Sequence, residues 1–373
     1  MEAEAPDRLE IVPLEEVPPG ALLPLLDACL GARPGAGSEP AERGEEFWRW
    51  KHERNPFGRS PGLVALHAGE PVALRAFLRW RWRVDGRDLE AVRAVDTATH
   101  PVWRRRGLFR RLTTELVERL RAEGTALVFN TPNPKSRAGY LAMGWHDVGR
   151  VPLLVRPRRP GRLLKAALAG LGRRGGIPST GSDAPIDPGA GSSLRPVGEL
   201  LEAPALPGLL ASRRAMPGRL ETARSPDYLR WRYAEAPGVR YLADWSLDRG
   251  SDPSPDGVAG AGGAAIVVRS RVRRGLRELT LAEILVSDDP AGRAAAAGLI
   301  GRLVRSAEAD YVAALATPGS PERAVLRSAG FLPLPPSAGR GGPRLVVRPL
   351  APIAPDPRNP AAWRLSVGDL ELF

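Results

Sequence analysis

The order of hydrophobic and polar positions divides the first part of the chain into strand and helix patterns. The predicted elements are a strand at 9–14, helices at 19–30 and 45–54, and strands at 63–67, 72–84 and 89–97. Turn sequences separate the three later strands, and one of them is Asp85-Gly86, a strong hairpin signal. This part of the chain therefore predicts an antiparallel meander that follows two helices.

The period then changes from two residues to that of a helix. Leucines recur on one stripe between 107 and 123, and Gly124 ends the pattern. A short buried strand at 126–130, a helix at 135–143 and a strand from Trp145 follow. We therefore expect an α/β fold (α+β mixed sheet), with a largely antiparallel central sheet flanked by helices.

An internal repeat predicts two domains of this kind in tandem. The segment that begins Phe47-Trp-Arg-Trp aligns without gaps on the segment that begins Tyr228-Leu-Arg-Trp, and later segments align at a similar spacing. Residues 157–193 are rich in Pro, Gly, Ser and Arg. The expected domains are an N-terminal domain at 1–156, a linker at 157–193, a second domain at 194–350 and a tail at 351–373 that docks as an edge strand.

Within the linker, an apolar stretch that starts at Leu163 has two interpretations. It could form a short basic helix that touches a membrane surface or a partner. A loosely ordered linker is the simpler interpretation.

Composition changes the picture in three ways. Of the 373 residues, 43% are hydrophobic and 26% charged, as in globular proteins. The single cysteine, Cys29, excludes disulfide frameworks and cysteine-rich metal sites, so we expect no metal. The acidic start and the lack of a long apolar run predict no export signal and no membrane span, and so a cytoplasmic protein.

The formal charge of +12 raises the question of a nucleic-acid partner. Only Lys51, Lys135 and Lys165 are lysines among 54 basic residues, a bias that GC-rich codon usage explains. We therefore do not expect nucleic acid as the main partner. An acidic or phosphate-bearing ligand suits the arginines equally well.

The most informative segment runs from the end of the third meander strand into the following helix. Its loop, at 100–107, ends in Arg104, Arg105, Arg106 and Gly107. Free backbone N–H groups and the positive end of a helix meet there, and glycine lets an anion approach closely, which favours a pyrophosphate site. A basic helix start with no ligand is the alternative.

Residues 8–156 resemble the GCN5-related N-acetyltransferase (GNAT) superfamily. The resemblance rests on Arg104-x-x-Gly107 between a strand and a helix, on Asn133-Pro-Lys-Ser136, and on Tyr140-x-x-x-Gly144-Trp145. It implies two acetyltransferase-like domains and acetyl-CoA as the acyl donor. The implied cofactor-binding residues are Thr97, Ala98 and Thr99 for the pantetheine arm, Arg104, Arg105, Arg106, Gly107, Leu108 and Phe109 for the pyrophosphate, and Asn133 and Ser136 beside the far end of the cofactor.

This sequence departs from the family pattern at three places. Phe109 stands where Gly or Ala is usual, and Arg93 stands where several members carry a basic glutamate. The second repeat has Pro290-Ala-Gly-Arg at the loop, without Arg-x-x-Gly. We therefore expect the second domain to be a degenerate copy that has lost the cofactor.

Acetyl transfer from a thioester to an amine needs a base and a proton for the departing thiolate. The resemblance places Tyr140 near the sulfur as the proton donor, although a helix tyrosine can also serve core packing. The base has several candidates: Asp96, His100 or an ordered water relay. Asp369, Glu371 or the terminal carboxylate of the tail could act as a surrogate base, against plain structural docking of the tail.

The tryptophans have structural interpretations as well as functional ones. The repetition of Trp50 as Trp231, in a domain without the phosphate loop, favours a structural role for both. Trp80 and Trp82 alternate with arginines along one strand and could either stack on a ligand or form one buried face.

The main hypothesis is an acetyl-CoA-dependent N-acetyltransferase that acts on a primary amine of a small molecule. Two alternatives keep the tandem fold: an aminoacyl-tRNA-dependent transferase resembling the FemABX group, and a non-catalytic binding scaffold. The phosphate loop favours the first hypothesis, because tRNA-dependent transfer does not need a cradle for CoA pyrophosphate.

Overall fold

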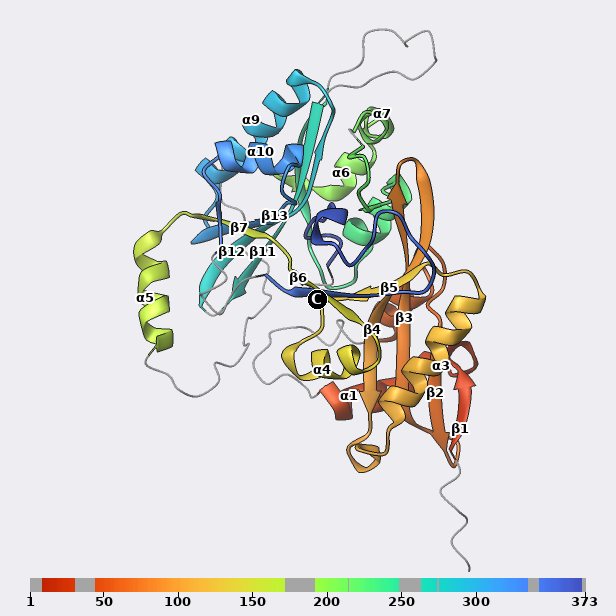
Figure 1. Ribbon diagram of the computed structural model, residues 1–373. Coiled ribbons are helices and arrows are strands. Elements are labelled where there is room, and N and C mark those ends of the chain that lie inside the picture. The colour runs from red at the N-terminus through yellow and green to blue at the C-terminus, as the bar shows by residue number, and fades with distance from the viewer. Residues whose placement is uncertain are drawn as a thin grey trace, which may run out of the picture.

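The computed structural model describes residues 9–30, 44–171, 192–213, 215–247, 263–273, 275–334 and 342–370. Two β-sheets dominate it, and helices cover them in two lobes that meet along the middle of the molecule (Figure 1). The mixed α/β architecture that the hydrophobic pattern predicts is confirmed.

The first sheet follows the predicted meander and continues across its far edge. Its strand order is β1-β2-β3-β4-β5-β15-β6, and β9 pairs with β3. The strands are β1 (Glu10–Pro13), β2 (Gly62–His67), β3 (Glu70–Val84), β4 (Arg87–Thr99), β5 (Leu127–Asn130), β6 (His146–Arg150), β9 (Glu221–Thr222) and β15 (Arg344–Pro349). All pairings are antiparallel except that of β4 with β5.

The second sheet repeats this arrangement. Its order is β14-β7-β13-β12-β11-β10-β8, and β12 with β13 is its parallel pair. The strands are β7 (Leu153–Pro157), β8 (Arg195–Pro196), β10 (Leu242–Leu247), β11 (Gly263–Arg273), β12 (Leu276–Val286), β13 (Tyr311–Leu315) and β14 (Leu332–Pro333). Two tandem domains of similar topology are therefore present.

The two lobes exchange one strand each. β7, from the end of the first half of the chain, lies between β13 and β14 of the second sheet, and β15 lies between β5 and β6 of the first. The expected divisions at 156/157 and 350/351 therefore do not follow the sheets. An apolar pattern shows that a strand exists, but it does not say which sheet the strand joins.

Helices lie against both sheets (Figure 1). They are α1 (Pro19–Leu30), α2 (Glu45–His52), α3 (Leu108–Ala122), α4 (Pro134–Ala142), α5 (Pro160–Leu171), α6 (Val197–Leu201), α7 (Leu206–Ala211), α8 (Pro226–Leu229), α9 (Pro290–Ser306) and α10 (Pro321–Ser328). The predicted leucine stripe of α3 is buried. The first part of the expected linker forms α5, so the helix alternative is correct there, while residues 172–191 lie outside the described residues.

Trp50 and Trp231 join the two repeats. The indole N–H of Trp50 donates to the backbone carbonyl of Trp231 at 2.7 Å, and Trp231 donates to the carbonyl of Trp50 at 2.8 Å. The rings stack with centroids 5.2 Å apart. The structural interpretation of this pair is confirmed. Trp80 and Trp82 are also buried in the core, so their interpretation as ligand-stacking residues is wrong.

The tail does not form the predicted edge strand. The described residues from 351 to 370 follow an irregular path with one 3-10 turn, Pro360–Ala362, and one isolated bridge between Leu220 and Trp363. The alternating apolar side chains that suggested a strand, Trp363, Leu365 and Val367, are buried in the core. Burial alone accounts for the alternation, so a strand partner is not needed.

Candidate functional site

The parallel strands β4 and β5 separate partway along their length. They pair only from Ala91 with Leu127 to Arg93 with Phe129, although β4 continues to Thr99. The register of β4 with β3 also shifts, because Arg75 faces Thr97 while Phe77 faces Ala94, so β4 carries an extra residue there. Such a bulge bends a strand and redirects its backbone groups. Beyond Arg93, β4 and β5 are not paired, and this separation of the two strands is called the opening.

Thr97, Ala98 and Thr99 lie on this separated part of β4. They pair with Arg75, Leu74 and Ala73 of β3. Because backbone groups of a strand point alternately to its two sides, part of this backbone faces the opening. That these three residues hold a pantetheine arm stays a prediction of the resemblance.

The loop after β4 opens onto the start of α3. Gly107 precedes the helix with φ +76°, and Arg105 also has a positive φ, of 64°. A Cβ added to Gly107 would meet nothing within 4 Å, so the space in front of the helix is open. Leu108 and Phe109, in the first turn, have backbone N–H groups with no partner inside the helix. Such a helix start favours an anion.

The three loop arginines are exposed and differ in their contacts. The Arg104 guanidinium donates through Nε to the carbonyl of Thr99 at 3.2 Å and so braces the loop. Arg106 covers the Trp103 ring, with 4.4 Å between the guanidinium carbon and the ring centroid. Arg105 supplies the left-handed turn.

Phe109 fits at its unusual motif position because a glycine faces it. A Cβ added to Gly139 would lie 3.1 Å from the Phe109 ring. The Phe109 ring also packs edge-on against Tyr140, with centroids 5.6 Å apart. The Phe109 ring thus fills the space between α3 and α4 next to Tyr140.

Tyr140 lies near the end of α4 and is 4% exposed. Its ring contacts both Phe109 and Trp145. Packing of the Tyr140 ring against Phe109 and Trp145 leaves room for a separate role of the Tyr140 hydroxyl.

Asn133 and Ser136 start α4. The Asn133 side chain accepts from the backbone N–H of Ser136 at 2.9 Å, and the Ser136 hydroxyl donates back to Asn133. These bonds cap the helix, which explains why polar residues occupy both positions.

Asp96 is engaged in ion pairs. Its carboxylate lies 2.9 Å from Lys51 Nζ and 2.8 Å from His52 Nε2, both on α2. Burial raises the pKa of Asp96, but Lys51 and His52 outweigh burial and hold that pKa well below its usual range. A carboxylate so strongly held in its ionised form is a poor proton acceptor. The geometry therefore disfavours Asp96 as the base.

The backbone of His100 stabilises the turn that follows β4. Its backbone N–H donates to the carbonyl of Val72, and its carbonyl accepts from the N–H of Trp103.

Three residues of this region were not among the sequence candidates: Lys51, His52 and Arg75. Lys51 is one of three lysines in an arginine-rich chain, which was an available signal. His52 follows it in a segment interpreted as structural. Arg75 is fully buried in β3, and its position opposite Thr97 could not be found before the bulge was known.

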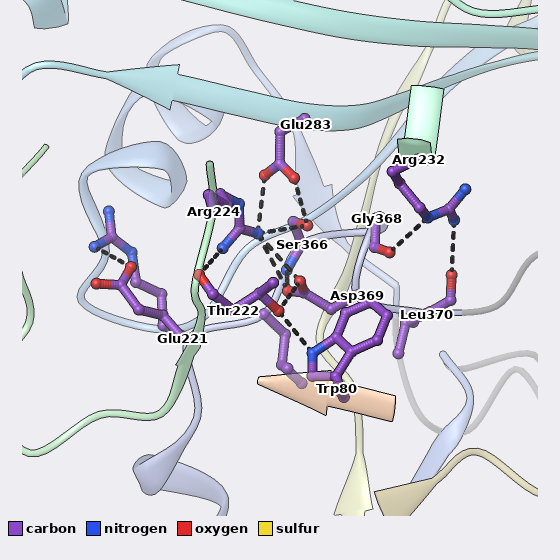
Figure 2. Close-up of polar contacts among 12 residues, drawn as sticks. Trp80, Glu221, Thr222, Arg224, Arg232, Glu283, Ser366, Gly368, Asp369 and Leu370 are labelled. Carbon is purple, nitrogen blue, oxygen red and sulfur yellow. Dashed lines mark hydrogen bonds and ion pairs between the residues drawn. The ribbon is translucent and has the colours of Figure 1, made fainter. Parts of the chain in front are cut away.

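Among the surrogate bases, the Asp369 carboxylate is committed to a buried network (Figure 2). It accepts from the Thr222 hydroxyl at 2.6 Å and lies 3.2 Å from Arg224. Figure 2 also shows Arg224 reaching Glu283, at 3.0 Å, and Trp80 reaching Thr222, also at 3.0 Å. The Asp369 side chain is therefore structural. Glu371 and the terminal carboxylate lie outside the described residues.

Arg93 ties this tail to the first sheet. Its guanidinium donates to the backbone carbonyl of Asp369 and, at 3.0 Å, to the hydroxyl of Thr131. The residue that stands at the glutamate position thus fastens the tail next to the point where β4 and β5 separate.

The equivalent place in the second sheet is filled. β12 and β13 pair only from Glu278 to Leu281, and the tail enters beyond that point: the Gly368 N–H donates to the carbonyl of Ala282. Asp289 caps α9 by accepting from the N–H of Gly292 at 2.7 Å. A carboxylate thus occupies the helix start where an anion would bind.

The described residues show neither a metal-binding cluster nor a helix able to cross a membrane. They contain no cluster of three or more His, Cys, Asp or Glu side chains able to hold a metal ion. None of the helices in the described ranges combines the length and the apolar character that crossing a membrane requires.

Comparisons with known proteins agree on the fold. The acetyltransferase (GNAT) domain family matches residues 25–148. A comparison with curated proteins gives no match. A GCN5-related N-acetyltransferase from Kribbella flavida is similar in structure, with TM-score 0.51 and 18% identity over 92% of this chain and 72% of that one.

Two further solved structures share the architecture. A GCN5-related N-acetyltransferase from Anabaena variabilis has TM-score 0.56 and 12% identity, covering 92% of this chain and 73% of its own. Saccharomyces cerevisiae N-myristoyltransferase, solved with bound myristoyl-CoA, has TM-score 0.51 and 14% identity, covering 93% of this chain and 79% of its own. At these identities the similarity shows the fold.

Proposed function

We propose that the protein is an acetyl-CoA-dependent N-acetyltransferase that acts on a primary amine of a small molecule, because residues 25–148 match the acetyltransferase (GNAT) domain family. The acyl donor binds in the opening between β4 and β5 of the first sheet. The observation that carries the proposal is the open, left-handed start of α3 directly beyond the separated end of β4.

The cofactor fits the groups that are present. Pyrophosphate would accept hydrogen bonds from backbone N–H groups at the start of α3, with exposed arginine side chains around it. The pantetheine arm would follow the backbone of Thr97, Ala98 and Thr99. Bound acetyl-CoA would supply the activated acyl group, as a thioester. The myristoyl-CoA bound to the yeast N-myristoyltransferase supports acyl-CoA use by this fold.

Tyr140 is the proposed proton donor. The amine nitrogen attacks the carbonyl carbon, the C–S bond breaks, and the sulfur leaves with the electron pair. The Tyr140 hydroxyl gives its proton to that sulfur, while the amine nitrogen loses one to a base or to water. The products are an amide and a thiol.

The second domain contributes to the structure and to the shape of the acceptor cleft without binding cofactor. The carboxylate of Asp289 at the start of α9 and the tail beside Ala282 support this assignment. Each chain should therefore hold one CoA.

Calorimetric titration of the full chain with CoA tests the proposal. We expect a single site per chain, and a thermal upshift that grows with ligand concentration. Transfer is then measured by thiol release from acetyl-CoA with a panel of primary amines, with myristoyl-CoA as the comparison donor. Two equivalent CoA sites, or no CoA binding at all, would contradict the proposal. Absence of binding would favour the scaffold or the tRNA-dependent alternative.

A further inference from the structure

A buried arginine lies against the proposed proton donor. Arg75 of β3 is 0% exposed and lies on the face of the sheet that α3 covers, opposite Thr97. A fully buried guanidinium is costly unless other groups compensate its charge. A nearby negative group would therefore stabilise the buried Arg75 guanidinium.

The hydrogen bonds of Arg75 use only part of its donor capacity. Nη1 donates to the carbonyl of Val95 at 3.2 Å and to the Thr97 hydroxyl. Nε and Nη2 have no hydrogen-bond partner among the described residues. No carboxylate of those residues forms an ion pair with it.

Three aromatic rings surround the guanidinium. Its carbon lies 4.4 Å from the ring centroid of Phe77, 5.7 Å from that of Phe109 and 5.4 Å from that of Tyr140. The negative faces of aromatic rings stabilise a cation. Among these rings, only Tyr140 carries a hydroxyl that can become an anion.

We propose that Arg75 is the electrostatic partner of Tyr140: its guanidinium stabilises the phenolate that Tyr140 becomes after giving its proton to the departing thiolate. The role in catalysis rests on the function proposed above, whereas the pairing of the two side chains does not. Arg75 touches neither donor nor acceptor in this assignment. It is a positioning residue that acts through Tyr140.

The chemistry explains why a charge is retained in this core. When the phenol O–H bond breaks, the proton and the sulfur form a thiol, and a negative charge appears on the phenolic oxygen inside a low-dielectric site. A fixed cation nearby favours that charge without reorganisation. Burial lowers the pKa of Arg75, and the Tyr140 side chain and Asp96 counteract this effect.

Other charged groups near Tyr140 stay constant in the test. Asp96 lies on β4, and its carboxylate forms ion pairs with Lys51 and His52. The Arg348 guanidinium covers the far ring, Trp145, at 5.3 Å. Asp96 also interacts with Arg75, but Lys51 and His52 keep it ionised, so the charge of Asp96 should not change when the Arg75 charge is removed.

The test follows the ionisation of Tyr140 directly, in the full chain and without cofactor. Tyrosine labelled with ¹³C at Cζ gives one signal for each of five tyrosines, and Tyr140→Phe assigns the relevant one. We expect Arg75→Met to move the midpoint of the Tyr140 titration upward by about one pH unit or more, the size typical of a lost neighbouring charge. Arg79→Met, on the same strand but on a half-exposed arginine, is the matched control and should leave it unchanged.

A second readout links the pair to turnover. Arg75→Met should lower kcat for acetyl-CoA with a reactive amine by about tenfold and move the alkaline limb of its pH profile, while the KM for acetyl-CoA changes little. Arg75→Lys, which keeps the charge, should recover part of the rate.

The outcomes separate the two proposals. An unchanged Tyr140 midpoint in both Arg75→Met and Arg75→Gln, with the other four tyrosine signals in place, overturns the pairing. The second variant keeps the test valid if the first does not fold. If Tyr140→Phe leaves turnover intact but Arg75→Met still moves the midpoint, the pairing stands and the catalytic role of Tyr140 fails.

Discussion

The strand pairs β4–β5 and β12–β13 have equivalent neighbours in the two sheets but different contents. Each is the parallel pair of its sheet, and in each the two strands separate after a few paired residues. A helix, α3 or α9, lies between the two strands in the chain. In the first sheet, the loop that follows β4 has free space at Gly107, where an added Cβ would meet nothing within 4 Å. Beyond β12 the chain's own tail donates a backbone hydrogen bond to Ala282.

The starts of α3 and α9 also differ in whether a side chain of the protein already satisfies their backbone N–H groups. Before α3, Gly107 and Arg105 place backbone N–H groups and positive charge toward solvent. Before α9, the Asp289 carboxylate already accepts from Gly292. An internal carboxylate thus satisfies the start of α9, whereas the start of α3 is the one proposed to bind an external anion. Loss of a ligand site requires only that a side chain of the protein satisfy the same groups.

The largest expected effect comes from blocking the open helix start. Gly107→Glu places a carboxylate at the proposed pyrophosphate site, so CoA affinity should fall by roughly a thousandfold, as loss of several charge-assisted hydrogen bonds implies. Calorimetry measures it. Gly86→Glu is the control, because Gly86 has a similar φ of +78° and equally open surroundings in the β3–β4 hairpin. Retained affinity in Gly107→Glu would remove the distinction between the two helix starts.

The next effect concerns chemistry in the first domain. Tyr140→Phe should lower kcat by about a hundredfold while CoA affinity changes little, because only the proton donor is lost. Thiol release at saturating acetyl-CoA measures kcat, and calorimetry measures affinity. Unchanged turnover would leave Tyr140 with its packing role alone.

The junction of the repeats should respond equally from both sides. Trp50→Phe removes an indole N–H and leaves the Trp231 carbonyl buried without its donor, so the free energy of unfolding should fall by about 2 kcal/mol. Trp231→Phe should cost a similar amount, and the double variant less than the sum, because both share one stack. Urea denaturation gives the values. Strict additivity would show that the reciprocal contact is not coupled.

The smallest effect tests the closed helix start. Asp289→Ala removes a cap and should cost about 1 kcal/mol of stability without creating a CoA site. The Ser287 hydroxyl and the Gly292 N–H lower the pKa of Asp289. Its charge therefore stabilises the fold above its unfolded pKa of about 4, and this contribution is lost as the pH falls through the lower folded value.

Asp289→Asn provides the control for that pH dependence. It keeps the cap but removes the charge, so its stability deficit should be greatest near neutrality and shrink in acid. Thermal denaturation across pH 2 to 7 measures it. CoA binding gained by Asp289→Ala would mean that the tail does not close the second domain.

The sequence predicted the sheets well because each strand and helix has a local signal. The Asp85-Gly86 hairpin, the α3 leucine stripe and the α3 start at Gly107 all follow from patterns a few residues long. The exchange of β7 and β15 was missed because strand partners are chosen by packing across the whole molecule.

The contacts that candidate site residues make with partners distant in the sequence could not be predicted. The sequence predicted Asp96 as a candidate base, but α2 places Lys51 and His52 beside its carboxylate. Arg75 shares the alternation of Arg79, Arg81 and Arg83 along β3, which are partly exposed to solvent. Helices cover one half of that strand face and leave the other open, so one periodic pattern gives two environments.

The exchanged strands also bear on how the polypeptide matures on the ribosome. The sheet that carries the candidate site needs β15, and β15 ends at Pro349. During synthesis, β5 and β6 must therefore wait, with the place between them unfilled, until almost the whole second lobe has emerged. A nascent chain stalled in between would present two unpaired strand edges, which are sites of aggregation and chaperone capture. The sheet that carries the candidate site is thus completed late in synthesis, when β15 becomes available to pair with β5 and β6.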